Sequence, residues 1–153
     1  MDILIANEDE ARVFTGVSDE IEAVKALSMG VEIAVLKVGE RGSYISSKGK
    51  IIKIAPKAAG TAVDTTGAGD LWASGFLFGF ANGYSLEKCG ELGSACGYEV
   101  CQVIGANIPE EGWQRIKNRG QKDLALSYPC RRSRFRGKGI VLKSPKWSIG
   151  VLE

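Results

Sequence analysis

Short apolar segments alternate with helix-forming segments along the first 117 residues of this chain. The segment 31–38 is mostly apolar and β-branched, which is typical of a strand buried on both faces of a sheet. Because parallel strands need a long crossover, usually a helix, the alternation predicts an α/β fold: a three-layer αβα, Rossmann-like arrangement around a mainly parallel sheet. The expected strands are 2–6, 31–38, 43–47 and 50–55, the last two joined as a hairpin, and the expected helices are 7–14, 18–29, 71–84, 85–101 and 109–117.

The ends of these helices carry recognisable signals. Ser18 and Ser85 are the expected N-caps of the second and fourth helices, because a serine hydroxyl can accept a hydrogen bond from a main-chain N–H of the first turn. Pro109 opens the last helix, where its missing N–H costs nothing. Gly75 and Gly79 lie in the apolar third helix, and we expect them to let this helix pack closely on the sheet.

The charge is unevenly distributed along the chain. Residues 1–117 carry a net charge of −5 and residues 118–153 a net charge of +7, which together give the overall +2. We therefore place a boundary near Asn118, between an α/β domain and a basic tail. A basic segment with aromatic residues can bind RNA or anionic surfaces, but we favour a divergent extension that adds an edge strand at most. The basic cluster consists of Arg131, Arg132, Arg134 and Arg136 around Phe135.

Several classes of site are excluded by composition. The chain has no histidine, which removes Ser-His-Asp and Cys-His catalysis and histidine-ligated zinc. None of the four cysteines forms a Cys-x-x-Cys pair, and Cys89 and Cys96 share a face of a predicted helix, so we expect buried, reduced thiols.

No apolar run reaches the roughly 18 residues that span a bilayer, and acidic residues come too early for a signal peptide. We therefore expect a cytoplasmic protein with no membrane partner.

The segment 64–70, DTTGAGD, runs directly into the apolar third helix. The first main-chain N–H groups of a helix lack intrahelical partners and the helix dipole is positive there, so this terminus favours an anion. Asp70 would then face the bound anion, and a carboxylate beside an anion suits proton abstraction next to a phosphate. The simpler interpretation is that Asp70 only complements the helix dipole and the glycines form a tight turn.

The segment 64–77, DTTGAGDLWASGFL, resembles the second signature of the ribokinase-like (PfkB) carbohydrate kinases. The resemblance implies that the amides of Gly67, Ala68 and Gly69 form an anion hole for the transferred phosphoryl group and that Asp70 is the catalytic base. It covers residues 2–117, and family members are usually about twice as long as this chain. The chain is therefore expected to be the carboxy-terminal part of a ribokinase-like fold, truncated at its N-terminal side. Its motifs are most similar to bacterial adenosine-kinase-like members.

An acidic segment follows the first predicted strand. Its pattern is similar to the family's Asn-x-x-Glu motif, and this match implies that Asn7 helps to hold the phosphates and that Glu10 holds Mg²⁺ through a water. The position is consistent with a site, because α/β sheets bind ligands at the carboxyl ends of their strands. Taken alone, the acidic residues are better explained by complementation of the helix dipole.

A second turn has the pattern of a nucleotide-binding element. Lys37, Gly39 and Gly42 follow a core strand and resemble the family's Gly-x-x-Gly turn, in which glycines let the main chain approach ATP. A plain turn is the alternative. The chain contains no Walker A pattern and no Gly-x-Gly-x-x-Gly after a strand, so neither a P-loop nor a dinucleotide site is predicted.

Asp64 and Thr66 offer oxygen atoms beside the expected anion hole. In many family members these positions hold a potassium ion together with main-chain carbonyls of a later loop, which here would be 100–105. Carbonyl ligands leave little trace in a sequence. Asp64 is therefore a candidate for a monovalent cation site or for a loop cap.

The resemblance implies an ATP- and Mg²⁺-dependent phosphotransferase that moves the γ-phosphate to a primary hydroxyl of a sugar or nucleoside. The residues that select the acceptor are mostly absent, so adenosine, ribose, fructose and ketodeoxygluconate all stay open. Two alternatives are a nucleotide-binding module without turnover and a nucleic-acid binder acting through the basic tail. A nucleic-acid partner is not expected, and we leave a homodimer open.

Overall fold

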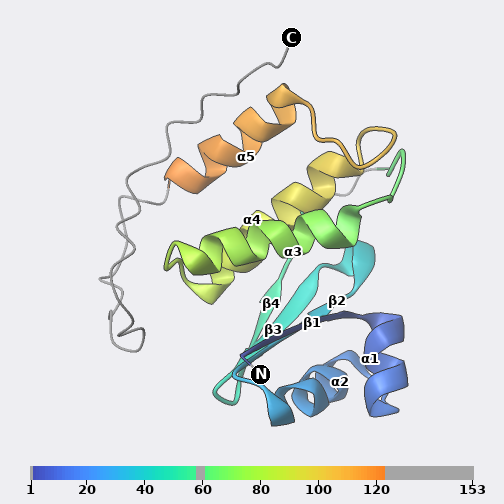
Figure 1. Ribbon diagram of the computed structural model, residues 1–153. Coiled ribbons are helices and arrows are strands. Elements are labelled where there is room, and N and C mark those ends of the chain that lie inside the picture. The colour runs from blue at the N-terminus through green and yellow to red at the C-terminus, as the bar shows by residue number, and fades with distance from the viewer. Residues whose placement is uncertain (1, 58–60, 123–153) are drawn as a thin grey trace.

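The computed structural model describes residues 2–57 and 61–122, with side chains as far as residue 118 (Figure 1). The predictions for Cys130, the basic cluster and the edge strand of the tail lie outside the described residues. The strands are β1 (Ile3–Asn7), β2 (Ile33–Lys37), β3 (Ser43–Ser47) and β4 (Lys50–Ile54). The helices are α1 (Glu8–Thr15), α2 (Glu20–Leu27), α3 (Ala68–Ala81), α4 (Leu86–Val100) and α5 (Glu110–Lys122), with short 3₁₀ turns at Ser28–Gly30 and Gly39–Arg41.

The strands form one sheet in the order β1-β2-β3-β4. β1 and β2 are parallel, whereas β2–β3 and β3–β4 are antiparallel, so the sheet of the described residues is mixed. This corrects the expectation of a mainly parallel sheet. The reason is the predicted hairpin: Lys48 and Gly49 both have positive φ, which closes a tight turn and reverses the chain.

Helices cover both faces of the sheet, which confirms the three-layer prediction. α1 and α2 lie on one face, and α3 and α4 lie on the other (Figure 1). Side chains alternate along β2 accordingly: Ala34 and Leu36 pack into the cluster under α1 and α2, and Ile33 and Val35 into the cluster under α3 and α4. β2 is buried on both faces because its apolar run supplies both clusters.

The glycines of α3 serve a different contact from the one predicted. A Cβ on Gly75 would lie 2.7 Å from the carbonyl oxygen of Leu92, and a Cβ on Gly79 would lie 3.2 Å from the Cα of Cys89. Both neighbours belong to α4. These glycines therefore permit a close helix–helix approach, not close packing of α3 on the sheet.

Several helix ends also differ from the sequence expectation. Asp19, not Ser18, caps α2, because its Oδ1 accepts hydrogen bonds from the N–H groups of Ile21 and Glu22 at 3.0 and 2.9 Å. Ser85 caps α4 as predicted. α3 begins at Ala68, three residues earlier than expected, and α5 continues to Lys122 across the predicted domain boundary.

The prediction of buried, reduced thiols is confirmed for Cys89 and Cys96, whereas Cys101 is unpaired but only partly buried. Cys89 and Cys96 are buried, unpaired thiols, and burial raises the pKa of each to about 11. Such thiols are protonated at neutral pH and therefore poor nucleophiles and metal ligands. Among the described helices, none has the length and hydropathy needed to span a bilayer.

Candidate functional site

The first turn of α3 presents unpaired main-chain N–H groups. Gly67 is the N-cap residue, with φ +75° and ψ 0°. The N–H groups of Gly67, Gly69 and Asp70 form no hydrogen bond with any described residue, whereas the N–H of Ala68 donates to the carbonyl of Thr65 at 3.1 Å. The expectation that all three amides of the anion hole are free is therefore wrong for Ala68. The turn before the helix already uses that donor.

Gly67 is required by its conformation and by its packing. Its φ lies in the left-handed region, and a Cβ there would lie 2.7 Å from the Cβ of Ala106. Ala106 follows the loop after α4, so this loop is pressed against the start of α3. The position of the unpaired amides thus depends on a contact between segments far apart in the sequence.

Asp70 lies in the first turn of α3 and is exposed. Its carboxylate forms no hydrogen bond or ion pair with a described residue, although its main-chain carbonyl accepts from the Ser74 hydroxyl at 2.8 Å. The carboxylate is thus available to a ligand. The neighbouring unpaired amides make this a helix terminus that favours an anion.

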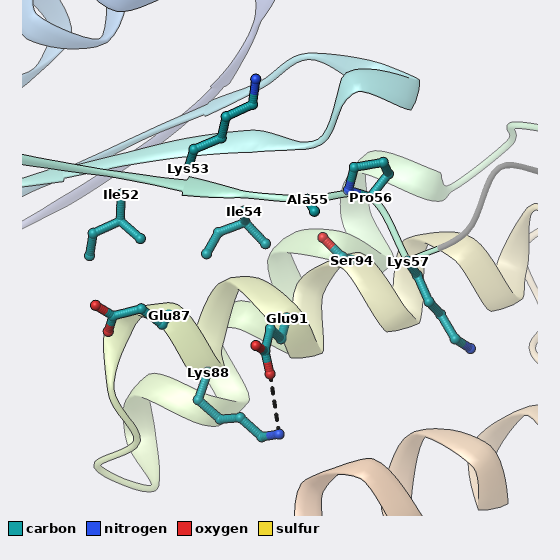
Figure 2. Close-up of a pocket in the computed structure, with 10 residues that line it drawn as sticks. All are labelled: Ile52, Lys53, Ile54, Ala55, Pro56, Lys57, Glu87, Lys88, Glu91 and Ser94. Carbon is teal, nitrogen blue, oxygen red and sulfur yellow. Dashed lines mark hydrogen bonds and ion pairs between the residues drawn. The ribbon is translucent and has the colours of Figure 1, made fainter.

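A hollow of about 490 Å³ lies elsewhere, between β4 and the first half of α4 (Figure 2). Ile52 and Ile54 point from β4 toward α4, and an ion pair between Lys88 and Glu91 lies on the helix side. Asp70 does not line this hollow, so its carboxylate faces the open surface.

Lys37 brings a positive charge to the same helix terminus. It ends β2, and its Nζ lies 3.1 Å from the position that a Cβ of Gly69 would occupy. Lys37 forms no ion pair with a carboxylate of the described residues. An ammonium group next to unpaired amides strengthens the attraction for an anion, because fixed dipoles and a full charge then act together.

Asn7 lies directly opposite Lys37 in the parallel pairing of β1 and β2. The Asn7 side chain accepts from the N–H of Glu10 at 2.8 Å, and the Glu10 carboxylate accepts from the N–H of Asn7 at 2.7 Å. The two residues therefore form a capping box at the start of α1. Only one Glu10 oxygen takes part in it, so the other oxygen has no hydrogen-bond partner among the described residues.

The Gly39–Gly42 turn is closed by its own hydrogen bonds. The N–H of Gly42 donates to Gly39 at 3.1 Å, and the N–H of Val38 donates to Gly42 at 3.0 Å. A Cβ on Gly42 would lie 2.1 Å from the carbonyl oxygen of Ile54, so the close approach of the end of β4 explains this glycine. Gly39, with φ +59°, has open space around it and is the member of the pair that a ligand can approach.

Hydrogen bonds tie the loop before α3 to the loop after α4. Asp64 Oδ1 accepts from the N–H and the hydroxyl of Thr66 at 2.9 and 2.7 Å, and Oδ2 accepts from the N–H of Gly105 at 2.8 Å. The N–H of Gly105 and the Thr66 groups hold the pKa of Asp64 below its usual value. Asp64 thus acts as a loop cap, and its role at a cation site stays a prediction.

Sequence reasoning missed a buried ion-pair cluster. Glu99 of α4 is 2% exposed and accepts from Arg115 of α5 at 2.7 and 3.1 Å and from Lys57 of the segment after β4. The Lys57 ammonium also lies 4.7 Å from the ring centroid of Tyr98. These residues are too far apart in the sequence for a local pattern. The one signal in the sequence that pointed to a buried charge was Glu99 itself, a glutamate among the small and apolar residues in the second half of α4.

The chain matches the sequence profile described as "pfkB family carbohydrate kinase" over residues 1–112. It is 36% identical over 106 residues to a nucleoside kinase of Methanocaldococcus jannaschii, covering 69% of this chain and 33% of that protein. Among solved structures, adenosine kinase from Sinorhizobium meliloti is 32% identical with a TM-score of 0.71, covering 77% of this chain and 36% of that one. Arabidopsis thaliana ribokinase, complexed with ribose and ATP, is 33% identical with a TM-score of 0.68, and the match covers 76% of this chain and 41% of that one.

These similarities confirm the ribokinase-like fold and the resemblance drawn from the segment 64–77. The chain spans only 33–41% of the length of these relatives. The profile covers well over half of this chain and includes the anion-hole segment and both other motifs. The chain therefore belongs to the pfkB family of carbohydrate kinases.

Proposed function

We propose that this chain provides the nucleotide-binding and catalytic part of an ATP-dependent phosphotransferase, which moves the γ-phosphate of ATP to a primary hydroxyl of a sugar or nucleoside. The observation that carries the proposal is the first turn of α3. Unpaired amides, the Lys37 ammonium and an unpartnered Asp70 carboxylate meet there. This combination suits phosphoryl transfer, because catalysis of that reaction is mainly positioning and charge stabilisation.

The amides of Gly67 and Gly69 bind the equatorial oxygens of the transferred phosphoryl group, and Lys37 neutralises charge beside them. Removing one donor of such a site typically costs about 10²–10³ in rate. Ala68 contributes its N–H only if its 3.1 Å hydrogen bond to Thr65 opens. Two of the three expected donors, those of Gly67 and Gly69, are therefore unpaired among the described residues and available to a phosphoryl group.

Asp70 acts as the general base. It accepts the proton of the acceptor hydroxyl while that oxygen attacks the γ-phosphorus and the bond to the ADP leaving group breaks. Its exposure and its lack of a cationic partner among the described residues leave both carboxylate oxygens available for this proton. A correctly placed base contributes about 10²–10⁴ in rate.

The remaining motif residues fit the expected cofactors. The free oxygen of Glu10, with Asn7 beside it, would hold Mg²⁺ through water, and this ion would neutralise the phosphate charge of bound ATP. Asp64 and Thr66, next to the loop 100–105, would hold a monovalent cation that orders the start of α3. Gly39 would lie against the nucleotide. The ATP bound to the similar Arabidopsis ribokinase supports the nucleotide site.

The test is a phosphorylation screen of the gene product with ATP and Mg²⁺ against adenosine, ribose, fructose and ketodeoxygluconate. We expect one of these classes to be phosphorylated at a primary hydroxyl. The short coverage of the relatives supports one alternative, a nucleotide-binding module without turnover. Tight ATP binding without transfer to any acceptor would favour that alternative, and absence of ATP binding would refute both.

A further inference from the structure

The carboxyl ends of β1 and β2 lie side by side and lead into two of the motif segments. Asn7 and Lys37 are partners in the parallel ladder, and each is the last residue of its strand. Beyond them the ladder ends, and the chain continues as α1 after one strand and as the turn 38–42 after the other (Figure 1). Strand pairing therefore does not set the distance between the Asn7–Glu10 capping box and Gly39.

The side chain of Arg41 links these two segments. Its Nη2 donates to a carboxylate oxygen of Glu8, the first residue of α1, and its Nε donates to Glu20, the first residue of α2, at 2.9 Å. Within the described part of the chain, no other hydrogen bond or ion pair joins α1 to the turn 38–42. An arginine suits this double contact, because its guanidinium presents several N–H donors in a fixed fork.

The turn that Arg41 anchors is held together by its own hydrogen bonds. The N–H of Arg41 donates to the carbonyl of Val38 at 3.1 Å, and the N–H of Gly42 donates to that of Gly39 at 3.1 Å. Gly42 also lies against the carbonyl of Ile54. Because the turn is closed in this way, the Arg41 side chain fixes the position of Gly39, the residue with open space around it.

Stability alone does not account for the contact between Arg41 and Glu8. Their side chains are 54% and 47% exposed, and exposed ion pairs contribute little to the free energy of unfolding. Glu8 also differs from the neighbouring Asp9, which pairs with Arg12 of the same helix at 2.6 Å. Both acids complement the helix dipole, but Glu8 also reaches a segment 33 residues away.

We propose that Arg41 is a positioning residue for the complex of Mg²⁺ and ATP. Through Glu8 it holds the Gly39 turn in a fixed place relative to Asn7 and Glu10, so that one ligand can engage both segments together. Arg41 acts through Glu8 and does not itself contact the nucleotide or the metal ion. This inference rests on the proposed function, because it needs a nucleotide at Gly39 and Mg²⁺ near Glu10.

The experiment is a calorimetric titration of ATP into the 153-residue chain, with Mg²⁺ and with a chelator. In Arg41→Met we expect the gain in ATP affinity that Mg²⁺ provides to fall by about two- to thirtyfold, because the two segments no longer act together. The affinity without Mg²⁺ should change little, since the turn keeps its own hydrogen bonds.

A second variant shows whether Arg41 acts through Glu8. Glu8→Gln should cause the same loss as Arg41→Met, and the double variant should lose no more than either one, because both substitutions remove one contact. Arg41→Lys should restore part of the gain, since it keeps the positive charge but lacks the planar fork. Additive effects of Glu8→Gln and Arg41→Met would overturn the inference.

Arg12→Met is the matched control, because Arg12 also pairs with a first-turn acid of α1 but has no hydrogen bond to the turn. It should leave both affinities unchanged, and thermal unfolding is measured for every variant. An equal loss of affinity with and without Mg²⁺ in Arg41→Met would show that Arg41 only supports the fold, and would refute its positioning role.

The same titrations separate this inference from the proposed function. If the unchanged chain binds ATP and Arg41→Met keeps the full gain from Mg²⁺, the positioning role is wrong and the proposed function stands. If the unchanged chain binds no ATP, the proposed function fails and this inference fails with it.

Discussion

Asp70 and Lys37 carry opposite charges to the same helix terminus, yet they form no ion pair with each other or with another described residue. An ion pair between exposed charges would contribute only about 0–1 kcal/mol, so both groups stay available to a ligand at little cost. In the proposed reaction the phosphate attracts Lys37, and the acceptor hydroxyl approaches Asp70.

Replacing Asp70 by Asn in a phosphorylating form of the protein should reduce kcat by about 10²–10⁴, because the amide cannot accept the proton. ATP affinity should change little, since the carboxylate contributes no attraction to phosphate. The measurement is steady-state kinetics with a parallel titration of ATP binding. Glu87→Gln, a first-turn acid of α4, is the matched control. Near-normal turnover in the Asp70 variant would remove it from the base role.

Lys37→Met should weaken ATP binding to the chain by roughly ten- to hundredfold, the range expected for losing a hydrogen bond to a charged group. Lys37→Arg should retain part of the affinity because it keeps the positive charge. Calorimetric titration of both variants checks this, with Lys50→Met on the exposed hairpin as control. An unchanged affinity in Lys37→Met would show that this ammonium does not contact the nucleotide.

At the scale of the element, the geometry of the site depends on how α3 begins. Gly67 adopts a left-handed conformation and contacts Ala106, while Asp64 accepts from Thr66 and Gly105. The start of the helix is thus held from two directions by the loop that follows α4. These contacts fix the amides in position, which lowers the reorganisation that phosphate binding would need.

Gly67→Ala should destabilise the fold more than Gly16→Ala. Both glycines have φ near +75°, so each substitution carries the cost of a left-handed alanine, about 1–3 kcal/mol. Only Gly67 adds a clash, since a Cβ on Gly16 would meet no atom within 4 Å. Thermal unfolding of the two variants separates the cost of the left-handed conformation from the cost of the clash with Ala106. Equal losses would mean that the Ala106 contact relaxes freely.

At the scale of the whole molecule, the buried Glu99 cluster joins three segments: the chain after β4, α4 and α5. Burial by itself raises the pKa of Glu99. The hydrogen bonds from Arg115 and Lys57 outweigh it and hold the pKa below its ordinary value of 4.5. Removing one partner of such a buried pair typically costs about 3–5 kcal/mol, because the other charges are left uncompensated.

The lowered pKa of Glu99 determines the sign of the pH dependence. Its contribution is complete above the unfolded value near 4.5 and is lost as the pH falls through the lower folded value. Glu99→Gln should therefore destabilise the chain at pH 7 and lose less stability on acidification than the wild type. Denaturant unfolding at several pH values measures this, with the exposed Glu110→Gln as control. If the Glu99→Gln variant and the wild type lose stability in parallel as the pH falls, Glu99 does not cause the acid dependence.

The sequence by itself determined the family, the alternation of strands and helices, the hairpin and the glycine-led start of α3. These features follow from local periodicity and from chemistry within a few neighbouring residues. The tertiary structure decided that Gly42 leaves room for the carbonyl of Ile54 and that Gly75 leaves room for the carbonyl of Leu92. It also decided that the amide of Ala68 is hydrogen-bonded to Thr65. It also brought Lys37 to Gly69 and joined Glu99 to Lys57 and Arg115. Contacts between distant segments depend on how the layers pack, and no local pattern records that.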